Sequence, residues 1–319
     1  MPHEVVHGCR IYIGDNRLIM PTLPHSSVHC VVTSPPYYNQ RDYGHAGQIG
    51  LEKTPQEYID QLVKLFREVR LVMRRDATLW LNLGDKYIDG QLLGMPWRVA
   101  LALQADGWIL RSDIIWHRVN AMPGSQHDRP SCNHEYMFLL AREKNYYYDD
   151  VAIREPTTDA SGDRTKRTVW PVPVASEKEG HFAVFPPALV LPCILAGTSE
   201  HGCCAACGMP WQRDVERARV ATRPGLETKA TGDSAKEGNR DPQRHVTEIR
   251  TLGWRQGCKC ATQERKPAIV LDPFGGSGTT ACVAVANGRR AVLCELNPMY
   301  VEIAKRKLAK AIRRRGFVI

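Results

Sequence analysis

Long apolar runs are missing from this sequence of 319 residues. Residues 1–10 contain no stretch typical of a secretory signal peptide, and no later stretch approaches the length needed to cross a bilayer. These absences predict a soluble cytoplasmic protein with no membrane partner. In that compartment the 11 cysteines are not expected to form a disulfide framework.

The sequence also has no excess of negative charge, and its formal net charge is +9. This charge is compatible with a polyanionic partner, but also with a basic enzyme that binds no nucleic acid, so charge alone leaves both interpretations open. The composition, with 43% hydrophobic and 24% charged residues, excludes a disordered or fibrous chain. The length favours one large α/β domain, or one domain that carries a small inserted module.

Strand-like and helix-like segments alternate along the chain. Strands are expected at residues 10–13, 28–33, 78–83, 108–117, 135–142, 268–271 and 291–294. Helices are expected at residues 54–74, 96–106, 187–196, 280–287 and 300–313. This alternation predicts a mostly parallel sheet with helices on both faces. Polar stretches at 118–133 and 154–180 are expected to be long loops, which are usually functional in a compact domain.

A glycine-rich turn follows the expected strand at 268–271. It consists of Asp272, Pro273, Phe274, Gly275, Gly276, Ser277, Gly278 and Thr279. Glycines let a backbone approach a ligand closely, and the helix that follows offers free N–H groups. The turn matches neither the P-loop nor the G-x-G-x-x-G spacing, and a tight structural βα turn would also explain it. Glu295 ends the next strand, where an acidic group can bind a ribose diol, although a helix cap or surface carboxylate is the common role. Together these features indicate a nucleoside-containing cofactor.

A second turn, Ser34-Pro35-Pro36-Tyr37, follows the buried strand at 28–33. Its side chains are expected at the carboxyl edge of the sheet, where open α/β folds bind ligands. Chemistry on an exocyclic amine needs acceptors for both N–H groups, and the hydroxyl of Ser34 and the carbonyl of Pro35 could supply them. The stiff prolines would set these positions in advance, and Tyr37 could stack on a base. A purely structural diproline turn is the alternative.

Together, the two turns resemble the hallmark motifs of the DNA amino-methyltransferases, the cytosine-N4 and adenine-N6 site-specific family. Further resemblance lies in Gly14-Asp15, residues 80–85, Trp116-His117, His134-Glu135, residues 181–187 and residues 295–300. The catalytic turn precedes the cofactor turn, which is the permuted order of the family's β group. The resemblance covers most of the chain outside 154–180 and 203–262. It implies a Rossmann-like methyltransferase fold with a mostly parallel, seven-stranded sheet that contains one antiparallel strand.

The resemblance also implies the cofactor, S-adenosyl-L-methionine, and its site. The implied cofactor-binding residues are Asp15, Asp272, Pro273, Phe274, Gly275, Gly276, Ser277, Gly278, Thr279, Glu295 and Asn297. Among them, Glu295 would bind the ribose and Asp15 would lie near the adenine. The implied catalytic residues are Ser34, Pro35, Pro36 and Tyr37, which would hold a base flipped out of duplex DNA. The methyl group would then pass directly to the amino nitrogen, without a covalent intermediate.

The serine at position 34 of the motif resembles the cytosine-N4 enzymes of the family. We therefore expect cytosine N4 as the target, with adenine N6 as the main alternative. A methyltransferase for RNA or for a protein amide, and a non-catalytic DNA-binding zinc protein, are further alternatives. Cytosine C5 chemistry is not expected, because Pro192-Cys193 lies in an apolar helix and not after a strand. Expected partners are double-stranded DNA, a second copy of the chain and a cognate restriction endonuclease. The expected location is the cytoplasm of a bacterial, archaeal or phage-infected cell.

Residues 203–262 differ from the rest, because they carry many charges, few apolar runs and cysteines at both ends. Cys204 and Cys207 have the spacing of a zinc knuckle, and Cys258 and Cys260 provide a second pair. We expect these four thiolates to bind a structural zinc ion, with Cys203 as a substitute for Cys204 and unrelated thiols as the alternative. The predicted organisation is a catalytic part at 1–202, this inserted module, and a cofactor-binding part at 263–319. Contact between the module and DNA is a hypothesis.

Overall fold

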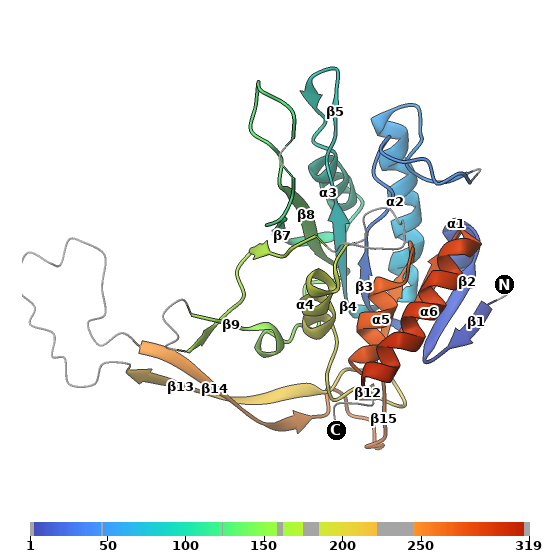
Figure 1. Cartoon of the computed structure of the whole chain (residues 1–319). Coiled ribbons are helices and arrows are strands. Elements are labelled where there is room, and N and C mark those ends of the chain that lie inside the picture. Colours follow the sequence, from blue (N-terminus) through green and yellow to red (C-terminus); the bar gives the residue numbers. More distant parts are fainter. Residues whose placement is uncertain are drawn as a thin grey trace, which may run out of the picture.

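A nine-stranded sheet forms the centre of the computed structural model, which describes residues 3–45, 47–122, 124–157, 162–174, 185–221 and 245–315 (Figure 1). Its strands, in spatial order, are β1 (His3–Val6), β2 (Cys9–Ile13), β17 (Arg290–Glu295), β16 (Ile269–Asp272), β3 (Val28–Thr33), β4 (Met73–Leu83), β8 (His134–Ala141), β7 (Ile109–His117) and β11 (Val169–Pro171).

The seven central strands run in the predicted directions. In spatial order they are β2, β17, β16, β3, β4, β8 and β7. β2, β17, β16, β3 and β4 are parallel to one another. β8 is antiparallel to both of its neighbours, β4 and β7. The mostly parallel seven-stranded sheet with one antiparallel strand is therefore confirmed.

Two short edge strands extend this sheet beyond the prediction. β1 pairs antiparallel with β2, and β11 pairs parallel with β7. The expectation that all of 154–180 is loop was therefore wrong at β11. Trp170, in the middle of this strand, is buried and lies 6.2 Å from the ring of Trp80, so one apolar anchor holds a short strand in an otherwise polar segment.

Six helices of the described chain cover the two faces of the sheet. They are α1 (Asn16–Ile19), α2 (Pro55–Val72), α3 (Met95–Ala105), α4 (Pro187–Gly197), α5 (Thr279–Ala286) and α6 (Pro298–Arg315). Successive side chains of a strand point to opposite faces, and β3 follows this rule. Val31 packs with α2 and α3 in one apolar cluster, whereas Cys30 and Val32 pack with α4, α5 and α6 in the other. None of the described helices has the length and apolar character of a membrane span.

The start of α2 illustrates how sequence sets an element boundary. The hydroxyl of Thr54 accepts a hydrogen bond from the Glu57 backbone N–H at 3.2 Å, and Pro55 occupies the first helical position. The Glu57 carboxylate in turn accepts from the Lys53 N–H at 3.0 Å. These contacts satisfy N–H groups that would otherwise have no partner, so the helix begins where the sequence predicted.

The remaining elements are small and lie at the periphery. They are the 3-10 turns Met20–Thr22 and Val151–Ile153 and the two-residue strands β5 (Tyr87–Ile88), β6 (Gln91–Leu92), β9 (Glu155–Pro156), β10 (Asp163–Arg164), β12 (Cys203–Cys204) and β15 (Arg265–Lys266). The predicted insert also contains a long hairpin of β13 (Gln212–Ala221) and β14 (His245–Arg255), which was not predicted from the sequence. Arg213 and Arg217 on β13 form ion pairs with Asp149 and Asp150, which attach the hairpin to the rest of the chain.

Candidate functional site

One pocket at the carboxyl edge of the central strands brings the two predicted turns together. The predicted residues that line it are Asp15, Ser34, Pro35, Pro36, Tyr37, Asp272, Pro273, Phe274, Gly275, Gly276, Ser277, Thr279, Glu295 and Asn297. The two turns are far apart in sequence, but they follow the adjacent parallel strands β3 and β16. Because the carboxyl ends of parallel strands meet at one edge, adjacency in the sheet places both turns in the same pocket.

Asp272 joins the two turns. Its carboxylate accepts hydrogen bonds from the hydroxyl of Thr33 at 2.6 Å and from the hydroxyl of Thr280 at 2.8 Å. It also accepts from the backbone N–H of Phe274 at 3.0 Å. Burial raises the pKa of Asp272 to about 6, and the three hydrogen bonds oppose this rise. Its carboxylate therefore holds the cofactor turn in place against the strand that leads to the catalytic turn.

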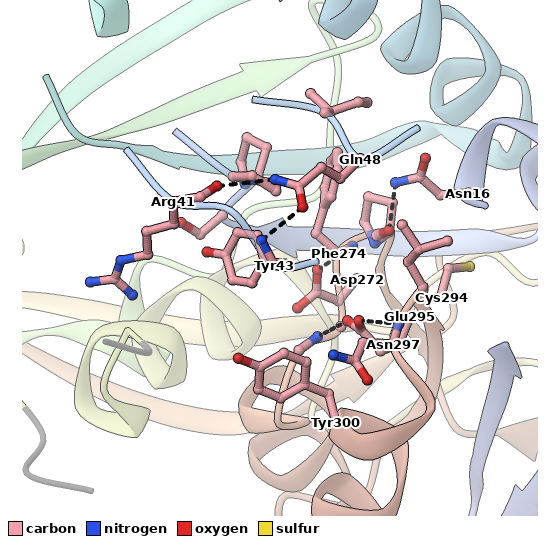
Figure 2. A pocket seen from close by; sticks show the side chains of 18 of the residues that line it. Asn16, Arg41, Tyr43, Gln48, Asp272, Phe274, Cys294, Glu295, Asn297 and Tyr300 are labelled. Carbon is pink, nitrogen blue, oxygen red and sulfur yellow. Dashed lines mark hydrogen bonds between the residues drawn. The ribbon is translucent and has the colours of Figure 1, made fainter. Parts of the chain in front are cut away.

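Glu295 lines the same pocket beside the glycine turn, at the end of the strand that pairs with the strand of Asp272 (Figure 2). Its carboxylate accepts hydrogen bonds from the backbone N–H of Gly276 at 2.6 Å and from that of Asn297 at 2.8 Å. Burial raises its pKa above the usual value, which these two N–H groups partly offset. The carboxylate thus lies at the end of β17, as the sequence predicted, where a ribose diol can reach it.

Gly278 is an exception among the predicted cofactor residues, because it does not line the pocket. Its φ is +81°, and a Cβ atom at this position would lie 2.7 Å from Cβ of Ala304. The glycine therefore permits close packing of α5 against α6, which explains its presence without a ligand contact.

The pocket wall near Asp15 is built by polar contacts among neighbouring loops. The Asp15 carboxylate accepts hydrogen bonds from the backbone N–H and guanidinium of Arg17, and Arg17 also donates to the carbonyl of Gly47 at 2.7 Å. Burial raises the pKa of Asp15, but the hydrogen bonds and charge of Arg17 outweigh this and leave it below its usual value. Asn16 donates to the carbonyl of Pro273 at 2.9 Å and so ties this wall to the cofactor turn.

Tyr37, in the catalytic turn, lies in a polar network with three other side chains. Its hydroxyl donates to the Glu135 carboxylate at 2.6 Å and accepts from the Asn82 amide at 2.6 Å. The hydroxyl of Ser34 donates to the Tyr37 oxygen at 3.2 Å. Burial and the neighbouring Glu135 carboxylate hold the pKa of Tyr37 well above its usual value, so the phenol stays protonated.

Arg118 and Glu135 complete this side of the pocket, with 3.3 Å between a guanidinium nitrogen of Arg118 and a carboxylate oxygen of Glu135. Arg118 directly follows β7, and Glu135 lies at the amino end of β8. Since β8 is antiparallel, its amino end reaches the same edge as the carboxyl ends of its neighbours. That reversal brings a glutamate from a distant part of the sequence to the catalytic turn.

Known DNA methyltransferases are similar to this chain over most of its length. Type II methyltransferase M.SmaI of Serratia marcescens is 36% identical over 335 aligned residues, which cover 96% of this chain and 92% of that protein. Type II methyltransferase M.Cfr9I of Citrobacter freundii is 35% identical, with coverage of 95% and 88%. The family model for N6/N4 methyltransferases, described as DNA methylase, matches residues 28–205 and 255–306.

The chain belongs to the N6/N4 DNA methylase family. This methylase is accordingly an S-adenosyl-L-methionine-dependent DNA methyltransferase, as the two turns indicated. The family match is interrupted only at 206–254, within the predicted insert.

Solved structures of low sequence identity share the fold. PvuII DNA methyltransferase, named as cytosine-N4-specific, has a TM-score of 0.61 at 16% identity and covers 96% of this chain and 92% of its own. TTHA0409 of Thermus thermophilus, complexed with S-adenosyl-L-methionine, has a TM-score of 0.54 at 21% identity, and the match covers 95% of each chain. Both confirm the Rossmann-like methyltransferase fold of this methylase.

Several lining residues of this methylase were not assigned a role from the sequence. They include Asn16, Gln40, Arg41, Gln48, Asn82, Glu135, Phe185 and Tyr300. Figure 2 shows Tyr43 and Tyr300 beside Glu295 and Asn297, and the two tyrosine rings meet edge-on at 6.4 Å. Residues 40–45 and 47–49 belong to the loop after the catalytic turn, and most of them line the pocket. Asn82 and Glu135 had a usable signal, because each lies where a predicted strand reaches the ligand-binding edge.

The four predicted cysteine ligands also come together. The Sγ atoms of Cys204, Cys207, Cys258 and Cys260 all lie within 4.8 Å of one another. Cys203, the predicted substitute, is not part of this group, and burial raises the pKa of its thiol to about 12. The Gln256 amide donates to Sγ of Cys258 at 3.1 Å, a contact suited to a metal-bound thiolate.

This cysteine cluster lies at the amino ends of the strands, opposite the methyl-transfer pocket. His29, near the start of β3, contacts the carbonyl of Gly208 at 3.0 Å through its Nε2 atom. Arg74, near the start of β4, donates to the carbonyl of Cys207 at 2.8 Å. In Figure 1, β12, β15 and the β13–β14 hairpin accordingly lie at the far end of the sheet from β5.

Proposed function

We propose that this methylase transfers a methyl group to the N4 atom of cytosine in duplex DNA, after the base has been flipped out of the helix. One observation carries the proposal: the Ser34–Tyr37 turn and the 272–279 cofactor turn line one pocket. The Ser34 hydroxyl is a neutral hydrogen-bond acceptor. A serine at this position of the motif resembles the cytosine-N4 enzymes of the family. PvuII DNA methyltransferase, which shares the fold, is named as cytosine-N4-specific, and its name agrees with this choice of base.

The catalytic turn would hold the amine during transfer. The Ser34 hydroxyl and the Pro35 carbonyl would accept the two N–H groups, which directs the nitrogen lone pair out of the ring plane. Hydrogen-bond acceptors placed in advance lower the barrier because they need no rearrangement during the reaction. Tyr37 would stack on the base, while its hydroxyl stays bound to Glu135.

S-adenosyl-L-methionine supplies the methyl group as a sulfonium when it is bound. The residues present fit it: Glu295 offers a carboxylate to a ribose diol, and Asn16, Tyr43 and Tyr300 line the same space. Gly275 lines the pocket, and it packs closely on β17, where a Cβ atom would lie 3.2 Å from Leu293 Cβ. Asp15 would contribute near the adenine.

We further propose that the cysteine cluster binds a structural zinc ion. In a tetrahedral site of four thiolates with Zn–S bonds of ~2.3 Å, neighbouring sulfur atoms are ~3.8 Å apart. The four Sγ atoms, all within 4.8 Å of one another, can adopt this arrangement with small side-chain movements. The position of the cluster at the amino ends of β3 and β4 favours a supporting role for the sheet over contact with DNA at the pocket, although the β13–β14 hairpin could still reach DNA elsewhere.

The proposed partners are double-stranded DNA, a second copy of the chain and a cognate restriction endonuclease, with cytoplasmic location in a bacterial, archaeal or phage-infected cell. The relatives named Type II methyltransferases support this setting. The net charge of +9 supports binding to a phosphate backbone.

Mass spectrometry of nucleosides tests the proposed reaction. Unmethylated DNA is incubated with the protein and S-adenosyl-L-methionine, with Ser34→Ala and Tyr37→Ala variants as controls. N4-methylcytosine that is lost in both variants is the expected result. N6-methyladenine would refute the cytosine assignment, and no methylated base on several DNAs, with cofactor binding intact, would refute the DNA substrate.

A further inference from the structure

A directed chain of hydrogen bonds leads from the catalytic turn to a carboxylate. The Ser34 hydroxyl donates to the Tyr37 oxygen at 3.2 Å, and the Tyr37 hydroxyl donates to Oε2 of Glu135 at 2.6 Å. The Asn82 amide donates to both the Tyr37 oxygen and Oε2 of Glu135, at 2.6 and 2.9 Å. Asn82 therefore holds the last two members of the chain together, and every donor points toward Glu135.

The reaction produces a proton that such a chain can accept. The amino nitrogen attacks the methyl carbon, a C–N bond forms, the S–C bond breaks and its electron pair stays on sulfur. The nitrogen then carries one proton too many, and that proton must leave before the aromatic amine is restored. An acceptor that is already in place while the C–N bond forms assists the step.

We propose that Glu135 receives this proton through Ser34 and Tyr37. Ser34 takes the proton from the amine while its own proton passes to the Tyr37 oxygen, and the Tyr37 proton passes to Oε2 of Glu135. One proton leaves the substrate, one is gained by the carboxylate, and the two hydroxyls are unchanged. The inference rests on the proposed function only in requiring an exocyclic amine, because cytosine N4 and adenine N6 release the same proton.

Other carboxylates that line the pocket are engaged elsewhere. Asp272 accepts from Thr33, Thr280 and a backbone N–H. Glu295 binds two backbone N–H groups, and Asp15 binds Arg17. Among the described lining residues, Glu135 is the carboxylate that contacts the catalytic turn.

The surroundings of the chain favour transfer to Glu135 without a charged intermediate on Tyr37. The guanidinium of Arg118 lies 3.3 Å from Oε1 of Glu135 and holds the carboxylate in place, with Oε2 directed at the Tyr37 hydroxyl. The phenol of Tyr37 resists ionisation because it is buried beside that carboxylate, which raises its pKa. The two proton movements at Tyr37 are therefore expected to be concerted.

The test uses the full-length protein and the single-turnover rate of methyl transfer to DNA. Glu135→Gln keeps the size of the side chain and one acceptor oxygen but removes its capacity to take up a proton, and Tyr37→Phe interrupts the chain while it keeps the ring. Each variant is expected to lower the rate ~100-fold, with cofactor and DNA dissociation constants within ~twofold of the parent. The double variant should lose no further activity, because both changes interrupt one pathway. The parent rate should be lower in D2O than in H2O, and this isotope effect should disappear in Glu135→Gln.

Glu143→Gln is the matched control, since Glu143 is half-exposed and pairs with Arg75, outside the pocket lining. It should leave rate and isotope effect unchanged. An unchanged rate in Glu135→Gln, a loss confined to substrate affinity, or multiplicative losses in the double variant would each overturn the proton pathway. Formation of N6-methyladenine would overturn the cytosine assignment alone, whereas a parent protein that methylates no amine would overturn both proposals.

Discussion

The ring of Tyr37 packs against the backbone of Gly84, so closely that a Cβ atom on Gly84 would lie 2.5 Å from Cε2 of Tyr37. Gly84 directly follows β4, and its φ does not lie in the left-handed region, so the glycine is required for space and not for backbone conformation. It therefore determines where the ring of the catalytic turn can lie.

Gly84→Ala is expected to displace Tyr37 from its position beside Asn82 and Glu135. Because small displacements of positioned groups are costly in catalysis, we expect kcat to fall ~100-fold, with little change in cofactor affinity. Steady-state kinetics and calorimetric cofactor titration measure the two effects. Gly253→Ala is the matched control, because a Cβ atom there meets nothing within 4 Å, and it should behave like the parent. Full activity in Gly84→Ala would show that Tyr37 can move without consequence.

Thr33→Val tests the connection between the two turns. The variant keeps the shape of the side chain but removes the hydroxyl that donates to Asp272 at 2.6 Å. Because the buried Asp272 carboxylate then lacks one hydrogen-bond donor, the free energy of unfolding is expected to fall by ~1–3 kcal/mol. It should also weaken cofactor binding, since Asp272 holds the cofactor turn. Chemical denaturation and cofactor titration are the measurements.

The cost of Thr33→Val should depend on pH in a defined direction. The pKa of Asp272 is raised to about 6, so the carboxyl group is protonated below that pH and needs fewer donors. The destabilisation is therefore expected to be larger at pH 7.5 than at pH 5. Thr247→Val, at an exposed position of β14, serves as the control for the substitution itself. Equal destabilisation at both pH values would contradict a charged Asp272 as the cause.

The strands and the two turns could be predicted because their signals are local. The apolar run at 28–33 ends abruptly at Pro35, and the run at 268–271 ends at Asp272, so both turns and their edge of the sheet follow from the sequence. The grouping of the four cysteines could be predicted from their spacing for the same reason. Gly278 was predicted to line the cofactor site, but close packing between α5 and α6 explains why a glycine stands there. No local sequence pattern distinguishes a glycine needed for packing from one needed for a ligand.

Contacts between distant segments could not be predicted in this way. Glu135 begins a predicted strand, but its contact with Tyr37 depends on the pairing of β8 with β4, which is a long-range choice. β11 is too short for a periodic pattern and depends on the burial of Trp170 against Trp80. The β13–β14 hairpin has polar residues on both faces, so the alternation that identifies a half-buried strand is missing from its sequence.

His29 should make stability depend on pH. Its Nε2 atom faces the Gly208 carbonyl, and its Nδ1 atom accepts from the Ile269 N–H at 3.1 Å. Burial, together with the positive charge of Arg74, lowers the pKa of His29 to about 4. A depressed histidine pKa means that the folded state favours the neutral ring. The corresponding stability is present above the unfolded pKa of ~6.5 and is lost as the pH falls toward 4.

The loss between pH 6.5 and 4 is expected to be ~3 kcal/mol, and urea denaturation across this range measures it. His29→Asn offers an acceptor to the Ile269 N–H but cannot take up a proton. The variant should be less stable than the parent at pH 7, yet its stability should fall less steeply with acid. Parallel pH profiles for the two proteins would contradict the assignment to His29.

Removal of metal from the cysteine cluster tests its proposed supporting role. The purified protein is expected to contain one zinc ion per chain, and a chelator or the Cys204→Ser, Cys258→Ser double variant should remove it. Because the cluster is bound to the start of β3 and β4 through Gly208 and Cys207, its loss should lower the melting temperature by several degrees. The affinity for a short target DNA should change less than ~twofold, since the pocket lies at the opposite ends of the same strands.

Cys282→Ser, outside the cluster, should retain both metal and stability. A protein that contains no zinc would contradict the metal assignment, whereas a large loss of DNA affinity without a loss of stability would instead indicate that the module contacts DNA.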